Sequence, residues 1–150
     1  MHRYIDERKI SMAKVTMFML CDSVNNLPGP QGVIPHLVAP QLVLRPMFIP
    51  GNFSFGISIG VQGLNLKVPT KLGFTITDPN GVVLQKAEDA EIPAVEQVDT
   101  LPPEQQGLML NLDIRNLVVQ EEGVYKFTLR VNGEPLEDQS IPIYRGIPHG

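Results

Sequence analysis

The sequence has no tryptophan and a single cysteine, Cys21, among its 150 residues. One cysteine cannot form an internal disulfide, so we expect a chain that folds without cross-links in a reducing compartment, the cytoplasm. Basic clusters are also missing, since 12 Lys and Arg residues stand against 16 Asp and Glu and give a formal net charge of −4. The electrostatic footprint of a nucleic-acid-binding protein is therefore absent, and we expect no nucleic-acid partner.

Long hydrophobic runs are lacking too. No apolar stretch approaches the roughly 18 residues that span a bilayer, so we expect no membrane partner. Residues 12–21 resemble a signal-peptide core, but Lys14 and Thr16 interrupt them and no small-residue cleavage site follows. We expect residues 1–11 to form a flexible extension, residues 12–145 to form one domain, and residues 146–150 to form a C-terminal tail.

Helical spacing of apolar residues is absent, and a period of two replaces it. The clearest case is Phe53 to Val61, where large apolar residues alternate with Ser and Gly. Lys71–Thr77, Leu108–Ile114 and Tyr125–Val131 alternate in the same way. Because strand side chains alternate between two faces, each segment predicts a strand with one face toward a core.

Turn residues separate these strands. Asp78-Pro-Asn-Gly81 and Asn132-Gly133 are sequences typical of tight hairpin turns. We expect Asn25–Gly32 to be a loop and Glu88–Gln106 to be a long exposed connection. Val33–Arg45 contains Pro35 and Pro40, so we expect either an edge strand or two short pieces there, with Gln41–Arg45 as the most strand-like portion. A return strand over Ser140–Tyr144 would lie at a sheet edge because Pro142 cannot donate a ladder hydrogen bond. The pattern predicts an all-β sandwich of two antiparallel sheets with seven to nine strands.

The segment from Leu112 to Phe127 carries the most specific motif. A strand ends near Leu117, and Glu121-x-Gly123-x-Tyr125 then leads into the next strand. This arrangement resembles the tyrosine corner of immunoglobulin-like sandwiches, in which Tyr precedes a core position by two residues. The resemblance implies a structural role for Gly123 and Tyr125, with Phe127 filling the position that antibody domains give to a cysteine.

From Met12 onward the chain also resembles a family of small uncharacterised bacterial proteins. The resemblance is carried by Lys14-Val-Thr16, Leu20-Cys-Asp22, Asp78-Pro-Asn-Gly81 and Gly123-Val-Tyr-Lys-Phe127. It implies a bacterial β-sandwich and brings no site residues with it.

No set of residues predicts a catalytic or metal site, and we expect no cofactor. The histidines His2, His36 and His149 are far apart in the sequence and have no metal-ligand spacing. Cys21 has no neighbouring cation that would lower its pKa, so we expect a buried, unreactive thiol.

The small residues of the Phe53–Val61 segment form the candidate interaction face, namely Ser54, Gly56, Ser58 and Gly60. One interpretation is a solvated outer face, and the other is a smooth surface on which a ligand or another backbone packs closely. We expect a non-catalytic interaction or structural module that binds a protein partner or itself. The alternative is a small-ligand domain, for a saccharide or metal, using the loops Asn25–His36 and Glu88–Gln106, and an enzyme is the third option.

Overall fold

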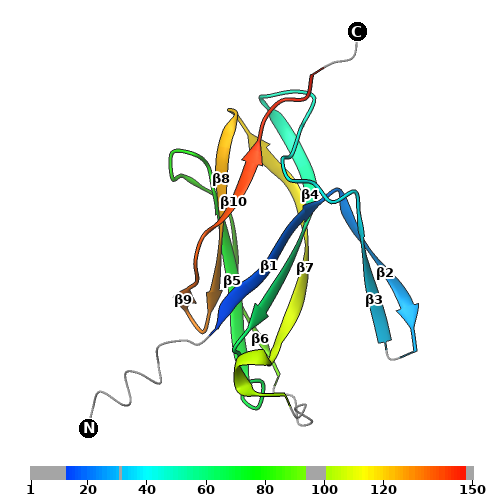
Figure 1. The fold of residues 1–150 in the computed structure, drawn as a ribbon. Helices are drawn as coiled ribbons and strands as arrows, with labels where there is room; N and C mark the ends of the chain where they lie inside the picture. The colour runs from blue at the N-terminus through cyan, green and yellow to red at the C-terminus, as the bar shows by residue number, and fades with distance from the viewer. Residues whose placement is uncertain (1–12, 31, 94–100, 148–150) are drawn as a thin grey trace.

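The computed structural model describes residues 13–30, 32–93 and 101–147, and these residues form an all-β protein (Figure 1). Within the described ranges, the one helical element is a single 3-10 turn, η1 (Pro103–Gln105). No helix in the described residues is long and apolar enough to cross a membrane. The described strands are β1 (Lys14–Cys21), β2 (Ser23–Gly29), β3 (Gly32–Val38), β4 (Gly51–Gln62), β5 (Thr70–Thr77), β6 (Val83–Ile92), β7 (Gly107–Val119), β8 (Gly123–Val131), β9 (Glu134–Pro135) and β10 (Gln139–Ile143).

The described strands form three antiparallel sheets. One has the order β1-β4-β7, and a second has the order β10-β8-β5-β6 with the short β9 paired to β8. The third contains only β2 and β3, which pair with each other. If the β2–β3 hairpin is set aside, the first sheet corresponds to strands A, B and E of an immunoglobulin-like sandwich, and the second to G, F, C and C′. The predicted fold class is therefore confirmed, with an additional hairpin inserted between the first two sandwich strands.

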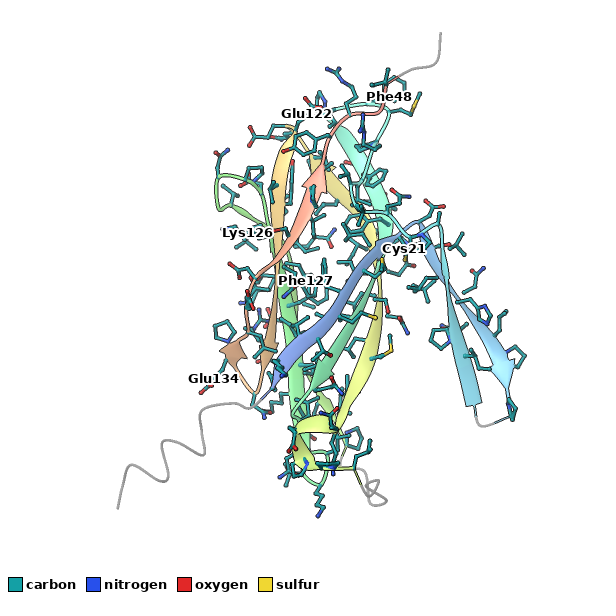
Figure 2. The ribbon with its side chains drawn as sticks, in the orientation of Figure 1. Cys21, Phe48, Glu122, Lys126, Phe127 and Glu134 are labelled. Carbon is teal, nitrogen blue, oxygen red and sulfur yellow. The ribbon has the colours of Figure 1, made fainter. Side chains whose placement is uncertain are left out.

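The core lies between the two larger sheets. Alternate residues of β4 point into it, and Ile57, Ile59 and Val61 are fully buried. The Phe127 ring lies near the middle of the sandwich (Figure 2), at 5.6 Å from the Phe18 ring and 5.1 Å from the Phe74 ring, measured between centroids. Phe18 belongs to β1 and Phe74 to β5, so a cluster of aromatic rings joins the two sheets around Phe127, which occupies the β8 position that an antibody domain gives to one cysteine of its disulfide.

Two segments differ from their predictions. Asn25–Gly32, predicted as a loop, lies within the β2–β3 hairpin, in which Asn25 pairs with His36 and Gly29 with Gly32. Prolines are tolerated there because each strand of an isolated hairpin has one edge without a ladder partner. Within Val33–Arg45, residues Val33–Val38 lie in β3, whereas the portion predicted as most strand-like, Gln41–Arg45, forms only isolated bridges from Gln41 to Leu20 and from Leu44 to Ile143. The prolines before and after this segment prevent a longer ladder.

The predicted exposed connection Glu88–Gln106 is also different at its start. β6 continues to Ile92, whose ladder partner is Thr70. Acidic residues are accommodated because β6 is an edge strand, and the Asp89 carboxylate lies 3.3 Å from the Arg130 guanidinium. The predicted edge position of the final strand is correct, since β10 pairs with β8 at one end of its sheet. The predicted extension, residues 1–11, lies outside the described residues.

Candidate functional site

The corner between β7 and β8 is built around Tyr125. Its side chain is 1% exposed, and its hydroxyl donates a 2.7 Å hydrogen bond to the carbonyl oxygen of Glu121. Burial raises the pKa of the Tyr125 hydroxyl, and the nearby charges of Glu121 and Asp78 raise it further against the opposing effect of backbone hydrogen bonds. Gly123 has a φ of +150°, and a Cβ there would lie 2.8 Å from Cγ of Pro79. A glycine is therefore required at the start of β8.

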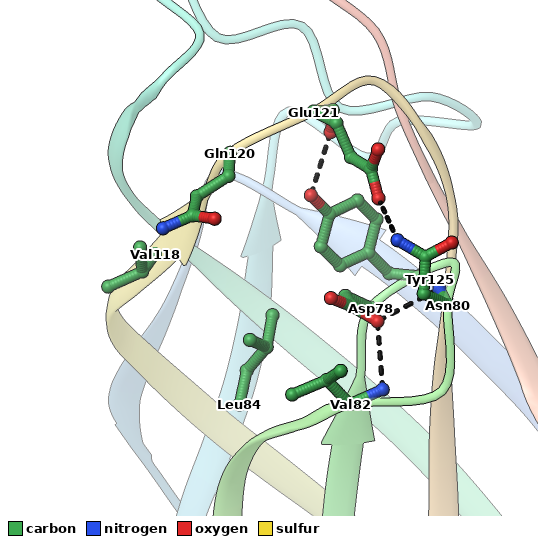
Figure 3. Close-up of a pocket in the computed structure, with 8 residues that line it drawn as sticks. All are labelled: Asp78, Asn80, Val82, Leu84, Val118, Gln120, Glu121 and Tyr125. Carbon is green, nitrogen blue, oxygen red and sulfur yellow. Dashed lines mark hydrogen bonds between the residues drawn. The ribbon is translucent and has the colours of Figure 1, made fainter.

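A hollow of about 450 Å³ lies beside this corner (Figure 3). One Asp78 carboxylate oxygen accepts hydrogen bonds from the backbone N–H groups of Asn80, at 2.9 Å, and Val82, at 2.8 Å. The Asn80 amide donates a 2.7 Å bond to the Glu121 carboxylate, which ties the β5–β6 turn to the corner. Oxygen acceptors thus lie on one side of the hollow, and Val82, Leu84 and Val118 supply apolar lining.

The predicted interaction face is mostly buried. Gly56, Ser58 and Gly60 are buried, and Ser54 alone is exposed. A Cβ at residue 56 would lie 2.8 Å from Sγ of Cys21 and 3.5 Å from the carbonyl carbon of Ser23. The Ser58 hydroxyl donates a 2.8 Å bond to the Asn111 side-chain oxygen. The chain's own neighbouring strands therefore cover these small residues, and the face is not solvated there.

Gly56, Ser58 and Gly60 form a lane of small residues along β4. The side chains beside this lane, on β1 and β7, form what we call the methionine face. Met19 and Asn111 are the ladder neighbours of Ser58, and Met17 and Met109 are those of Gly60. Because Ile57 and Ile59 point into the core, strand alternation directs the methionines to the outer surface. Met109 is 53% exposed, and the other three side chains are half-buried. Methionine surfaces are apolar and adaptable, which suits protein contacts.

The β2–β3 hairpin projects from the sandwich beside this face (Figure 1), and we call residues 23–38 the hairpin arm. The arm contains no Asp, Glu, Lys or Arg, although 19% of the whole chain is charged. At its base, the side chain of Val24 lies 3.4 Å from the point where a Cβ of Gly56 would stand. Towards its tip, Val33 is 67% exposed, so the sandwich does not cover this end of the arm.

Both faces of the hairpin arm carry exposed apolar side chains. Leu27 pairs with Ile34 on one face, and Pro28 pairs with Val33 on the other. Leu27 and Ile34 are each 44% exposed. An isolated two-stranded hairpin is only marginally stable in water, and exposed apolar patches commonly mark interaction sites. The arm is therefore the best candidate for a contact element.

Another exposed apolar group lies at the end of the sandwich near Phe48 (Figure 2). Charged groups break up this surface. The Arg45 guanidinium donates a 3.0 Å bond to the carbonyl of Arg145, and the Glu122 carboxylate accepts a 2.8 Å bond from the Arg145 N–H. The hairpin arm, in contrast, has no charged residue, although Asn25 and His36 lie on the same face as Leu27 and Ile34.

The remaining sequence candidates for chemistry lie apart. His36 lies on the hairpin arm, and His2 and His149 lie outside the described residues. Across the part of the chain that the structure describes, no three His, Cys, Asp or Glu side chains gather into a group that could hold a metal ion. Cys21 is buried at the base of the arm (Figure 2), where burial raises its pKa and the Asp22 charge raises it further. Its thiol is therefore protonated near neutral pH.

Sequence reasoning did not find the hairpin arm, because its prolines and glycines indicated a loop. One signal was available, namely the absence of any charged residue from Ser23 to Leu44, since the other long stretch without charge, Pro46 to Leu66, contains the buried strand β4. A solvated loop of that length would normally carry charge, whereas a surface that becomes covered would not.

The strand order, the buried corner tyrosine and the projecting hairpin define an immunoglobulin-like β-sandwich with an apolar arm. Residues 16–144 match the family model described as "Family of unknown function (DUF6941)", and the chain belongs to that family. The expected membership of an uncharacterised family is thus confirmed. A search of curated proteins found no match.

Proposed function

We propose that this protein is a non-catalytic interaction module that binds another protein through its hairpin arm. The observation that supports the proposal is the arm itself, which is free of charged residues and exposes apolar side chains on both faces. Interface cores are depleted of charged residues, whereas ordinary solvated surfaces are not. A cytoplasmic location belongs to the same proposal and is supported by the single, buried Cys21.

A non-catalytic role is supported by how the polar groups are used. The Asp78 carboxylate closes the β5–β6 turn, and Glu121 receives the Asn80 amide, so both acids around the corner hollow stabilise the fold. The buried thiol of Cys21 has a raised pKa, the opposite of what a nucleophile requires.

The test uses the full-length chain as bait in extract of the source cells. The protein that it retains is then purified and titrated by calorimetry against the wild type and the Val33→Lys/Ile34→Lys variant. Placing charges in an apolar contact should weaken binding at least ~30-fold, equivalent to about 2 kcal/mol.

The matched control is Val82→Lys/Val83→Lys, because these valines are 56% and 54% exposed but lie at the β5–β6 turn, away from the hairpin arm. Its affinity should equal that of the wild type. If the two double variants bind equally well, or if the bait retains neither another protein nor a second copy of this chain, the proposed role of the arm is wrong.

A second candidate function is the binding of a small ligand in the hollow beside Tyr125. Its volume of about 450 Å³ lies within the range of small-molecule sites, and its acceptors suit a ligand with hydroxyl or ammonium groups. The loops first expected to bind a ligand also line hollows. Pro30, Gly32, Val33 and Ile34 line one of about 370 Å³, and Pro103 and Gln106 help to line one of about 300 Å³ beside Gly63 and Leu64. Ligand binding by these loops therefore stays a prediction.

A thermal-shift screen of sugars and amines tests this candidate, because a ligand that binds only the native state raises the melting temperature. Val118→Trp would fill the hollow and should abolish any shift. A shift that persists in this variant would place the ligand elsewhere.

A further inference from the structure

We infer that the partner is a second copy of this chain, with the two hairpin arms exchanged across a twofold axis. In this dimer, the arm of each copy lies on the methionine face of the other copy. The inference rests on the proposed function and specifies its partner.

The chain supplies both surfaces that such a contact requires. The hairpin arm presents Leu27 and Ile34, which are exposed, apolar and adjacent across the two strands. The methionine face presents Met17, Met19 and Met109 around a lane of Gly and Ser. The hairpin arm carries no Asp, Glu, Lys or Arg, and Asp113, which lies on the same outer side of β7 as Met109, is already paired with Arg115 at 2.7 Å, so the contact leaves no buried unpaired ion.

The two surfaces are adjacent in the same copy, which favours a closed dimer. β2 begins two residues after the end of β1, and the Val24 side chain packs against Gly56 at the upper end of the small-residue lane. A twofold axis beside the base of the arm therefore places each arm on the methionine face of the other copy. An isologous contact of this kind closes on itself and does not form filaments.

The orientation of the arm shows which of its faces meets which surface. Val24 faces its own sheet, and strand alternation puts Pro28 on the same side, with Val33 opposite Pro28. Val33 is exposed, so this side of the arm has no intramolecular cover near the tip. In the dimer, these inward sides of the two arms pack on each other, and the outward sides with Leu27 and Ile34 lie on the partners' sheets.

The area that this arrangement buries agrees with a stable dimer. Each arm strand has 7 residues. At roughly 3.3 Å per residue and about 10 Å for the width of two strands, one face of the arm covers about 230 Å². The inward faces count only beyond the base of the arm, because Val24 rests on its own sheet. Two outward faces, the two sheet surfaces that they cover and the two inward faces therefore give at most about 1,400 Å², which reaches the range of specific interfaces. Contact through the outward faces alone would give about 900 Å², so we assign both sides of the arm to the interface.

A charge-complementation experiment tests the arrangement. Leu27→Lys changes the arm, Met109→Glu changes the methionine face, and both residues are exposed enough to be replaced without disturbing the core. In sedimentation-velocity runs over a range of concentrations, each variant alone should dimerise at least ~30-fold more weakly than the wild type. An equimolar mixture should form heterodimers at least ~10-fold more tightly than either variant alone, because one contact is native and the other pairs Lys with Glu.

Val82→Lys is the matched control and should dimerise like the wild type, and circular dichroism checks that every variant keeps its β-sheet spectrum. Three results would each overturn the arm exchange. The wild type could be monomeric at about 1 mM, neither variant could weaken the dimer, or the equimolar mixture could bind no more tightly than the single variants. Hydrogen exchange on the wild type gives a second measurement that needs no variant. Amides of residues 23–38 should exchange more slowly as the concentration rises, and unchanged exchange would also overturn it.

These outcomes separate this inference from the proposed function. If the wild type is a monomer and its partner no longer binds the Val33→Lys/Ile34→Lys variant, the arm exchange is wrong but the proposed function as an interaction module stands. If the wild type is a monomer and its partner binds the two double variants equally well, the arm exchange and the proposed function are both wrong.

Discussion

Replacing Tyr125 by phenylalanine isolates the contribution of one hydroxyl to this fold. The ring is buried, and its hydroxyl donates a 2.7 Å bond to the Glu121 carbonyl four residues earlier. The phenyl ring keeps the packing of the core, so no cavity is created. The variant loses the hydrogen bond and leaves the Glu121 carbonyl without this donor.

The expected loss of unfolding free energy is about 1–1.5 kcal/mol at pH 7, the net value of one such bond. Because Glu121 is exposed, water reaches the corner and the larger penalty of a fully buried unpaired group does not apply. Urea unfolding followed by circular dichroism measures the loss, and the melting temperature should fall by about 3–6 °C. The control is Tyr144→Phe, since Tyr144 is partly exposed and should change stability by less than about 0.5 kcal/mol.

The stability difference between the wild type and Tyr125→Phe should depend on pH, and its direction follows from the pKa of the Tyr125 hydroxyl. The pKa of Tyr125 in the folded protein is raised above its ordinary value of 10.0, so the folded state holds this proton more tightly than the unfolded state. That contribution to stability is fully present below pH 10.0 and is lost as the pH rises through the folded pKa. The stability difference between the wild type and Tyr125→Phe should therefore narrow above pH 10.0.

Two results would refute this reasoning. A loss below about 0.3 kcal/mol at pH 7 would show that the hydroxyl contributes nothing net to the corner. A difference that widens above pH 10.0 would show that the folded pKa is lowered and not raised.

Three further predictions concern the core, the β5–β6 turn and the thiol. Phe127→Ala should cost about 3–5 kcal/mol in urea unfolding, because it removes the ring that joins both sheets, and a cost below about 1.5 kcal/mol would contradict that role. Asp78→Ala should cost about 1–2 kcal/mol, because the N–H groups of Asn80 and Val82 lose their acceptor, whereas Asp78→Asn should recover part of it. Cys21 is buried with a raised pKa, so a thiol reagent at pH 8 should modify it only as fast as the native protein opens, and rapid labelling of the folded chain would show that the base of the hairpin arm is open.

Local patterns were enough to predict the sandwich. Phe53 to Val61 alternates so regularly that no helix could bury its apolar residues, and the structure has β4 there. Asp78-Pro-Asn-Gly81 predicted a turn, and Gly81 takes the positive φ of +87° that its sequence favours. The residues Gly123, Tyr125 and Phe127 were singled out because their segment resembles the tyrosine corner, a motif that spans only a few residues. All of these features depend on neighbours within a few residues along the chain.

Whether the small-residue face is exposed or covered was decided by the tertiary structure. Ser58 is buried because Asn111 comes beside it from β7, 53 positions further along the chain. Nothing within the Phe53–Val61 segment indicates this neighbour. The alternation determined which residues share the face, and the strand order determined that the face would be covered.

The hairpin arm is a second feature that local sequence patterns could not predict. Its prolines and glycines indicate a loop, since local propensity considers one strand at a time. Pairing between Ser23 and Val38 supplies the ladder that propensity could not predict. The sequence alone determined that this stretch would be apolar and uncharged. Only the folded sandwich, whose interior is already filled by its own strands, decided that it would remain outside the core.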